Sequence, residues 1–296
     1  MSIGLTKQFL YELHQVLEDE FCTEQLFEQL RFKLSLALMF DEIRGVVKSE
    51  DNSFYSNDLD IKFITEEELF QNPYLANISI PEEQRKNGFI IGRKNPIVTG
   101  LPIPFNISER NPVTLKLKRQ CFILKSDKKM IFMPSMSEED SSYCWMSIIP
   151  EEIKSLQKII DDAHGHVLLL GCGLAYAAYM IARKPDVKSV TVVDCSKEVI
   201  NLCQEIIVPQ IPLEFRNKIS FEVSEAISYL KTCDLSLYDY INVDVWHDTP
   251  DMIFTYLRCL EIEISAPEHN FSYWLEEKIR TEFQRFLMML ACDYPT

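Results

Sequence analysis

Four short segments of this 296-residue chain combine glycine, acidic and imidazole residues in patterns that suit nucleotide binding and proton transfer. A glycine turn occupies residues 171–173, and single acids follow at Asp194, Glu225 and Asp244, with His247 close behind the last. Carboxylates accept hydrogen bonds from ribose hydroxyls, and a carboxylate or an imidazole can take a proton from a nucleophile. These residues therefore predict a site that binds a nucleotide and does chemistry beside it.

The glycine turn, Gly171-Cys172-Gly173, lies where a strand is expected to end and a helix to begin. It follows the apolar run Val167–Leu170, and none of the eight glycines of the chain comes after Gly173. A backbone without Cβ lets a ligand approach closely, and the N–H groups at the helix start then face that ligand. We expect Gly171, Cys172 and Gly173 to bind a ligand; the alternative is a tight turn with a structural role alone.

Asp194 ends the second expected strand, 21 positions after Gly173. A carboxylate at such a strand tip can accept from both hydroxyls of a ribose, which is why adenosine-binding folds place an acid there. We expect Asp194, with its neighbour Cys195, to contact a ribose. The alternative is that Asp194 or Ser196 caps the helix that begins at Lys197.

A third acid, Glu225, follows the third expected strand and precedes Ala226. A carboxylate at this position can accept a hydrogen bond from an adenine amino group, and the small Ala226 leaves room for the ring. The equally supported alternative is that Glu225 complements the dipole at the start of the next helix.

The fourth segment contains Asp244, Trp246 and His247 at the expected carboxyl end of the fourth strand. Ligands of open α/β sheets bind at this edge, beside the point where the strand order reverses. Asp244 or His247 is the candidate group to hold or deprotonate a nucleophile, and Trp246 is placed to wall a pocket. The alternative for His247 is a loop histidine without a role.

Strands alternate with helices from residue 151 onward, and this pattern predicts an α/β fold with a doubly wound, mostly parallel sheet. The last expected strand covers Tyr240–Val245, and Pro250–Glu261 and Phe271–Leu290 have the pattern of helices. We therefore expect a Rossmann-like domain over residues 151–296 whose sheet is truncated at its C-terminal strands.

Residues 1–150 predict a helical and β-hairpin domain that covers the substrate. Helical spacing runs through residues 5–47, and the prolines of residues 71–112 favour loops and edge strands over helix. Gln120–Leu124 and Met130–Met133 flank a polar turn and predict a hairpin. The lysines around this hairpin are interpreted as its solvated face.

Composition and charge narrow the class of partner. The net charge is −15, and an acidic surface repels phosphate backbones, so nucleic acid is not expected as a substrate. Apolar runs are too short for a membrane helix, and the N-terminus lacks a signal-peptide pattern. The nine cysteines show no metal or disulfide spacing. We expect a cytoplasmic protein that acts on a small molecule or a peptide, with a cationic acceptor compatible with the charge.

The four segments, in this order, resemble class I S-adenosylmethionine-dependent methyltransferases, and within them the branch shared with spermidine synthase. The resemblance covers about residues 145–250 and is carried by three stretches, 145–150, 171–176 and 243–248. It implies S-adenosyl-L-methionine as cofactor. It also implies the residue roles, with Gly171 and Gly173 under the methionine part, Asp194 on the ribose, Glu225 on the adenine and Asp244 facing the sulfonium.

Departures from the family pattern keep three alternatives open. Leu169 stands where the family usually has an acid, and Ala175 replaces its third glycine. An aminopropyltransferase is one alternative, although Leu174 occupies the position where such enzymes place an acid. A dinucleotide-dependent oxidoreductase is the second, opposed by Tyr176 at its third glycine. The third is a scaffold that kept the fold without the reaction.

Overall fold

The computed structural model of the chain describes residues 59–110, 117–139, 144–246, 249–276 and 278–280. The chain divides into two compact units, and the larger one comprises residues 57–244 and 269–274. This unit includes residues before and after position 150. The domain boundary expected at that position stays a prediction. Within the described ranges, no helix has the length and apolar character needed to cross a membrane.

Two small sheets form the N-terminal part of the larger unit. The first has the order β1-β5-β4, with bounds Leu59–Thr65, Leu117–Lys125 and Pro102–Arg110. The second has the order β2-β3-β6-β7, with bounds Glu83–Lys86, Phe89–Val98, Met130–Glu138 and Cys144–Ser147. Between β1 and β2 the chain forms helices α3 (Glu66–Phe70) and α4 (Pro73–Asn77).

The hairpin expected between Gln120–Leu124 and Met130–Met133 is wrong. β5 is the central strand of the first sheet, whereas β6 belongs to the second sheet, so residues 126–129 carry the chain from one sheet to the other. Two apolar segments on either side of a turn can pair with each other as a hairpin, or each can pair with a strand elsewhere in the chain. A hairpin instead joins β2 to β3 at Asn87-Gly88, whose φ values of 53° and 82° suit the Asn-Gly preference of such turns.

Helix α4 lies inside the proline-rich stretch that was expected to exclude helix. Pro73 occupies the first turn, where a missing N–H breaks no hydrogen bond, and Asn72 caps the helix by accepting from the N–H of Tyr74 at 3.0 Å. The helix buries Tyr74 and Leu75. Proline is unfavourable at interior positions of a helix, but this restriction does not apply at the start of a helix.

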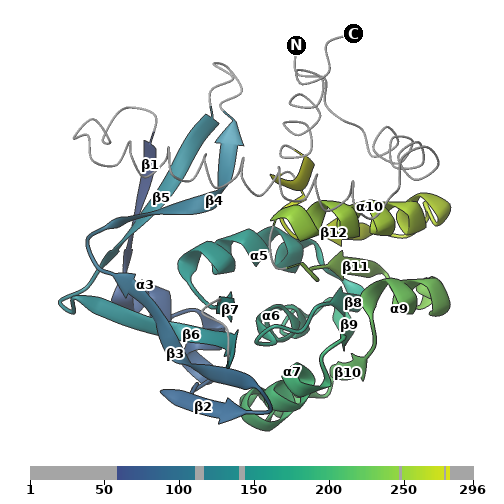
Figure 1. The fold of residues 1–296 in the computed structure, drawn as a ribbon, viewed down its shortest axis with the longest axis horizontal. Coiled ribbons are helices and arrows are strands. Elements are labelled where there is room, and N and C mark those ends of the chain that lie inside the picture. The colour runs from purple at the N-terminus through teal and green to yellow at the C-terminus, as the bar shows by residue number, and fades with distance from the viewer. Residues whose placement is uncertain (1–58, 111–116, 140–143, 247–248, 277, 281–296) are drawn as a thin grey trace. The chain divides into compact units, whose positions relative to one another are not determined.

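The expected α/β fold with a mainly parallel sheet is confirmed. Five parallel strands have the order β10-β9-β8-β11-β12, with bounds Ile219–Val223, Val187–Asp194, Gly165–Leu170, Tyr240–Val243 and Phe271–Tyr273. The α-helices of this part are α5 (Pro150–Asp162), α6 (Tyr176–Ala182), α7 (Lys197–Leu202), α8 (Leu213–Arg216) and α9 (Ala226–Thr232). Figure 1 shows α5, α6 and α7 on one side of the sheet and α9 on the other.

The sheet extends further than expected at its C-terminal end. Phe271–Tyr273 forms β12 beside β11, so the helix expected over Phe271–Leu290 is wrong for its first residues. Phe271 and Tyr273 are buried and alternate with the half-buried Ser272, which is a strand period. The backbone of β11 supplies the hydrogen-bond partners of these residues, and the local sequence pattern of residues 271–273 does not reveal them. Residues 281–290 lie outside the described part of the chain.

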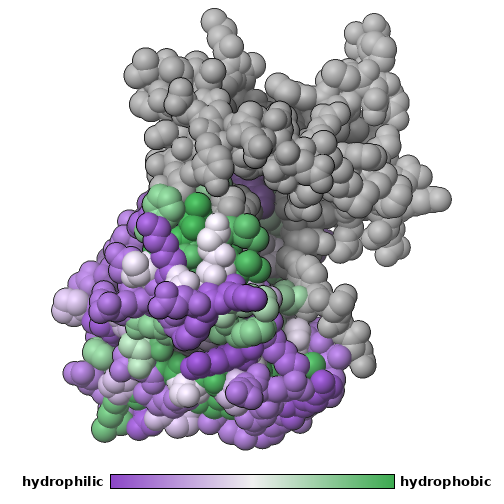
Figure 2. All heavy atoms as spheres, turned by 90° about the vertical axis from the view of Figure 1, so that its left-hand side faces the viewer, coloured by the Kyte–Doolittle hydropathy of each residue, from purple (hydrophilic) through white to green (hydrophobic). Residues whose placement is uncertain are grey.

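One hydrophobic cluster joins the second N-terminal sheet to the parallel sheet. It includes Ile91, Met133 and Met136 of the small sheet together with Tyr176 and Ala178 of α6. Larger apolar side chains also remain exposed over the two small sheets, among them Phe63, Val98, Leu101, Met130 and Phe132. Figure 2 shows this face as mainly hydrophilic with separate hydrophobic areas. The shared cluster holds β7 close to the start of α6.

The smaller unit contains helix α10 (Thr249–Ser265), which matches the helix expected over Pro250–Glu261. Its Tyr256 is 1% exposed and donates a hydrogen bond to Glu276 Oε1 at 2.8 Å. Burial and the neighbouring Glu276 raise the pKa of this phenol far above its usual value.

Candidate functional site

The structure brings the predicted site residues that it describes to one edge of the parallel sheet. Gly171 follows β8, Asp194 ends β9, Glu225 comes shortly after β10 and Asp244 follows β11. Because these four strands are adjacent and parallel, their carboxyl ends meet at the same edge. β8 has β9 on one side and β11 on the other, so this edge is the switch point where open α/β sheets bind ligands.

Gly171 is required by the backbone of the protein itself. Its φ is 105°, and a Cβ at this position would overlap the carbonyl oxygen of Asp244. The N–H of Gly171 donates to the carbonyl of Val193 at 2.8 Å, and the N–H of Asp244 donates to the carbonyl of Leu170 at 2.9 Å. Gly171 therefore allows the ends of β8, β9 and β11 to approach one another.

Met146 of β7 fills the space above Gly173. A Cβ on Gly173, whose φ is 48°, would overlap Met146 Sδ and lie 3.2 Å from its Cε. The N–H of Leu174 donates to the same sulfur at 3.0 Å. A thioether is a weak acceptor, so a better acceptor from a ligand could take this N–H once Met146 moved aside. Met146 was part of a resembling stretch, but the sequence held no sign of this contact.

Residues far from the turn hold it in place. The buried hydroxyl of Tyr74 donates to the carbonyl of Leu174 at 2.7 Å, and Asn72 Nδ2 donates to the Tyr176 hydroxyl at 2.9 Å. Cys203 Sγ lies 3.1 Å from the carbonyl oxygen of Gly173. Helix α4 and the segment after α7 thus fix the conformation of the turn.

Asp194 connects the glycine turn to the loop after β9. It is 9% exposed, its Oδ2 accepts from the N–H of Cys172 at 2.8 Å, and its Oδ1 accepts from the N–H of Ser196 at 2.8 Å. Ser196 is the residue that caps α7, through its hydroxyl and the N–H of Val199. Each carboxylate oxygen of Asp194 keeps a second acceptor position, so these contacts leave capacity for ribose hydroxyls.

Glu225 is the N-cap of α9, and its carboxylate accepts from the N–H groups of Ile227 at 3.0 Å and Ser228 at 2.7 Å. Ala226 is 7% exposed, and the side chain of Cys195 is exposed. Partial burial raises the pKa of the Cys195 thiol, and the charges of Asp194 and Glu225 add to this effect. Cys195 therefore lies close to both acids at the sheet edge.

A residue that no motif indicated, Glu152, is under the electrostatic influence of Asp244. Glu152 is half-buried in the first turn of α5, where an acidic residue is ordinary. Burial raises its pKa to about 8, and the negative charges of Asp244 and Glu151 contribute. Glu152 also helps raise the pKa of the Cys144 thiol on β7, after the effect of burial. The start of α5 thus converges with β7 and with the end of β11.

His247, the other candidate proton acceptor, lies outside the described residues, and its role stays a prediction. Trp246 is 5% exposed, and its indole Nε1 has no hydrogen-bond partner within the described ranges.

An adenosyl ligand fits the acceptors at this edge and meets one obstacle. Each carboxylate oxygen of Asp194 retains an acceptor position for hydroxyl donors, and Glu225 presents its carboxylate at the same edge. In the glycine turn, the N–H of Cys172 is bonded to Asp194 and that of Leu174 to Met146. A ligand that reaches the turn must therefore contact or displace the side chain of Met146.

No family model matches the chain, and no curated protein matches it. Solved structures with partial similarity include S-adenosylmethionine-dependent methyltransferases and a spermidine synthase. The spermidine synthase of Thermotoga maritima is 12% identical with a TM-score of 0.36, over 55% of this chain and 62% of that one. M. capricolum TrmK, solved in complex with S-adenosyl-homocysteine, is 16% identical with a TM-score of 0.30, over 40% and 48% of the two chains.

The methyltransferase domain of bacterial CtHen1 is 23% identical with a TM-score of 0.24, over 31% of this chain and 46% of that one. This chain spans less than two thirds of the length of each of these three proteins. With TM-scores below 0.5, the likenesses describe a partly shared fold and assign no residue a role.

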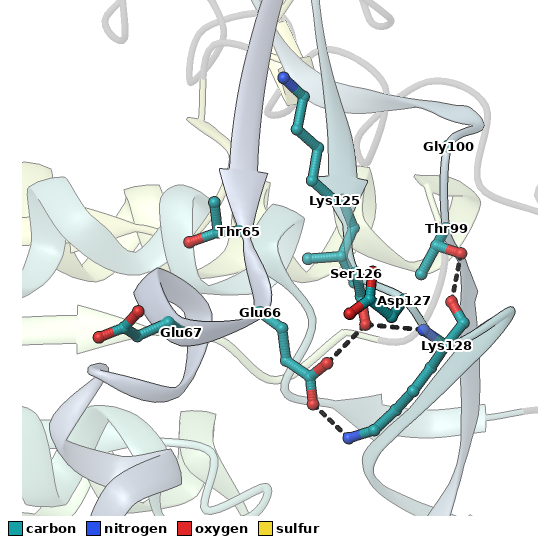
Figure 3. Close-up of a pocket in the computed structure, with 10 residues that line it drawn as sticks. Thr65, Glu66, Glu67, Thr99, Gly100, Lys125, Ser126, Asp127 and Lys128 are labelled. Carbon is teal, nitrogen blue, oxygen red and sulfur yellow. Dashed lines mark hydrogen bonds and ion pairs between the residues drawn. The ribbon is translucent and has the colours of Figure 1, made fainter.

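A pocket lies elsewhere, at the junction of the two small sheets (Figure 3). Glu66 accepts a hydrogen bond from Ser126 and forms an ion pair with Lys128, and these hydrogen bonds lower the pKa of the Glu66 carboxyl. Thr99 Oγ1 donates to the carbonyl of Lys128 at 2.6 Å. These polar groups of the pocket bond to one another, and none of the predicted site residues lines the pocket.

Proposed function

We propose that this chain binds S-adenosylmethionine at the carboxyl edge of the parallel sheet and transfers its methyl group to a small molecule or a peptide. The observation that supports this best is the meeting of Gly171, Asp194, Glu225 and Asp244 at the ends of four adjacent parallel strands. S-adenosylmethionine supplies a methyl group activated on a sulfonium. The protein then has to position the acceptor and manage its proton, so proximity supplies much of the rate.

In this proposal Asp194 and Cys195 contact the ribose, and Glu225 and Ala226 lie beside the adenine. Residues 171–173 pass along the methionine part. Asp244 faces the reacting atoms, with Asp244 or His247 as the proton acceptor.

The acceptor class follows from charge. A net charge of −15 creates a field that attracts cations and repels polyanions. We propose a small-molecule or peptide acceptor, with a cationic one favoured, and no nucleic acid partner.

The direct test is whether the purified full chain binds an adenosyl ligand. Native mass spectrometry of the protein as isolated, and again after addition of S-adenosylhomocysteine, should show a bound species. Isothermal titration calorimetry should then give its affinity. If the protein binds neither S-adenosylhomocysteine nor S-adenosylmethionine, the scaffold alternative is favoured. In that case Gly171, Gly173 and Asp194 would serve the contacts that they make within the protein.

Met146→Ala is expected to strengthen the binding of S-adenosylhomocysteine by about 2- to 10-fold. The substitution frees the N–H of Leu174 from a weak sulfur acceptor, and one good hydrogen bond contributes about 0.5–1.5 kcal/mol. Calorimetry on the full chain measures the change. Met146→Leu is the matched control, because leucine fills a similar volume and accepts no hydrogen bond, and it should not strengthen binding. Weaker binding by Met146→Ala would show that Met146 is a wall of the ligand site.

Aminopropyl transfer is the second candidate, and the nearness of Glu152 to Asp244 favours it, because paired acids suit the free amine of decarboxylated S-adenosylmethionine. Against it, the position after the glycine turn is Leu174, which is fully buried and carries no charge.

We expect S-adenosylmethionine to bind at least about tenfold more tightly than its decarboxylated form, since tenfold corresponds to about 1.4 kcal/mol, the size of one charged hydrogen bond. A competition assay with both cofactors measures this ratio, and putrescine should not be converted to spermidine. Preference for the decarboxylated form, or any spermidine formed, would reassign the chain to aminopropyl transfer.

A further inference from the structure

Helix α5 covers the face of the parallel sheet toward which Asn242 and Asp244 point. Side chains alternate along a strand, so Tyr240 and Asn242 of β11 share one face. Asp244, one residue after β11, still donates its N–H to Leu170 of β8 and so continues this register. The ring of Tyr240 lies 6.2 Å from that of His164, which follows the end of α5. The C-terminal end of α5 therefore lies over the start of β11 on this face.

A second contact places the first half of α5 over the same face. Trp274, directly after β12, donates from Nε1 to the hydroxyl of Ser155 at 2.9 Å. The Ser155 hydroxyl also donates to the carbonyl of Glu152 at 2.9 Å, one helical turn earlier. Residues three apart on a helix share a face, so Glu152 lies on the same side of α5 as Ser155. The negative charge of Asp244 raises the pKa of Glu152, which agrees with this placement.

The same face carries a buried acceptor without a partner. Asn242 is 2% exposed, and no described residue hydrogen-bonds to its Oδ1. It precedes Asp244 by one strand repeat, about 6.6 Å along β11. An unsatisfied buried acceptor costs about 1–3 kcal/mol, so its place two residues before Asp244 indicates that a donor reaches this point when the site is filled.

We infer that Glu152 is a further residue of the site, which with Asp244 receives the acceptor and takes the proton that its nucleophile must lose. This inference rests on the proposed methyl transfer. The acceptor's N–H or O–H bond breaks, its electron pair stays on the nucleophile, and the proton bonds to a Glu152 carboxylate oxygen. The nucleophile's pair then forms the bond to the methyl carbon, while the electrons of the broken C–S bond remain on sulfur.

The surroundings of Glu152 suit a general base. Burial and the charge of Asp244 raise the pKa of Glu152 to about 8, near the pH at which a general base works best. The negative charge of Glu151 on α5 also raises this pKa, and Glu152 in turn raises the pKa of the Cys144 thiol on β7. A cation beside Glu152 should lower its pKa, so with a bound sulfonium nearby the Glu152 carboxyl would lose its proton and be able to act as a base.

The test follows the Glu152 carboxyl by NMR titration of the full chain labelled at the glutamate side-chain carboxyl carbon. A signal that titrates near pH 8 should vanish in Glu152→Gln and shift to lower pH in Asp244→Asn. Saturating S-adenosylmethionine, which is cationic at sulfur, should lower this pKa by about 1 unit or more, and the neutral thioether S-adenosylhomocysteine should not. Glu151→Gln is the matched control, one residue away on the same helix, and should cause a smaller shift than Asp244→Asn.

The outcomes separate this inference from the proposed function. A Glu152 carboxyl that titrates at an ordinary value, or that ignores Asp244→Asn, overturns the pairing whether or not any cofactor binds. S-adenosylmethionine that binds but moves the titration no more than S-adenosylhomocysteine overturns the placement of Glu152 at the reacting atoms. If neither compound binds but Asp244→Asn still shifts the titration of Glu152, the proposed function is overturned, and so is the role of Glu152 as base. The pairing of Glu152 with Asp244 would then still stand.

Discussion

Gly171→Ala is expected to destabilise the protein by about 3–5 kcal/mol and to abolish adenosyl-ligand binding. Two costs add: a φ of 105° is strained for any residue with a Cβ, and the new methyl would overlap the carbonyl oxygen of Asp244. Relief requires the main chains of β8 and β11 to separate at the site edge. A loss of this size approaches the whole stability of an ordinary domain.

Urea denaturation followed by circular dichroism measures the loss, and two glycines serve as references. Gly100 has a φ of 78°, and a Cβ added there would meet nothing within 4 Å, so Gly100→Ala reports backbone strain alone, about 1–2 kcal/mol. Gly173→Ala meets the flexible end of Met146, and combining it with Met146→Ala should recover part of its cost. A Gly171→Ala protein as stable as Gly100→Ala would contradict the contact with Asp244.

Asp194→Ala is expected to lower both ligand affinity and stability. Loss of one good ribose contact costs about 1–3 kcal/mol, roughly a 5- to 150-fold weaker binding. The same change removes the acceptor for the N–H groups of Cys172 and Ser196, which should lower the free energy of unfolding by about 2–4 kcal/mol. Calorimetry with S-adenosylhomocysteine and urea denaturation, done where both proteins are folded, separate the two effects.

Asp234→Ala is the matched control for Asp194→Ala. Asp234 also accepts the N–H of the residue two positions on, Ser236 at 3.0 Å, but it lies before β11 and not at the carboxyl edge. Its loss should leave ligand affinity unchanged. If Asp194→Ala loses stability but binds the ligand normally, Asp194 is a structural residue and the ribose assignment fails.

The parallel sheet was predictable because each of its segments carries its own pattern. Buried parallel strands are short apolar runs, and the helices between them show helical spacing, so the order of elements after residue 151 follows from local composition. The third expected strand, which precedes Glu225, is present as β10 over Ile219–Val223. That Gly171, Asp194 and Asp244 share one edge then follows from parallel topology, since every strand ends there.

Strand partners in the N-terminal half were not predictable in the same way. β5 and β6 look like the arms of a hairpin, yet each pairs with strands elsewhere in the chain. β12, near the other end of the chain, has the pattern of a helix start, yet it joins the exposed edge of β11. In each case the deciding hydrogen bonds come from a distant segment, about which a local pattern carries no information.

The sequence alone therefore determined the α/β order, the glycine turn and the acids at the strand ends. Only the tertiary structure decided what those residues touch: Asp244 against Gly171, Met146 above Gly173 and backbone N–H groups on Asp194. It also showed that the charge of Asp244 raises the pKa of Glu152. The physical reason is that periodicity reports whether a side chain is buried, whereas packing between segments far apart in the chain decides which atoms fill the space around it.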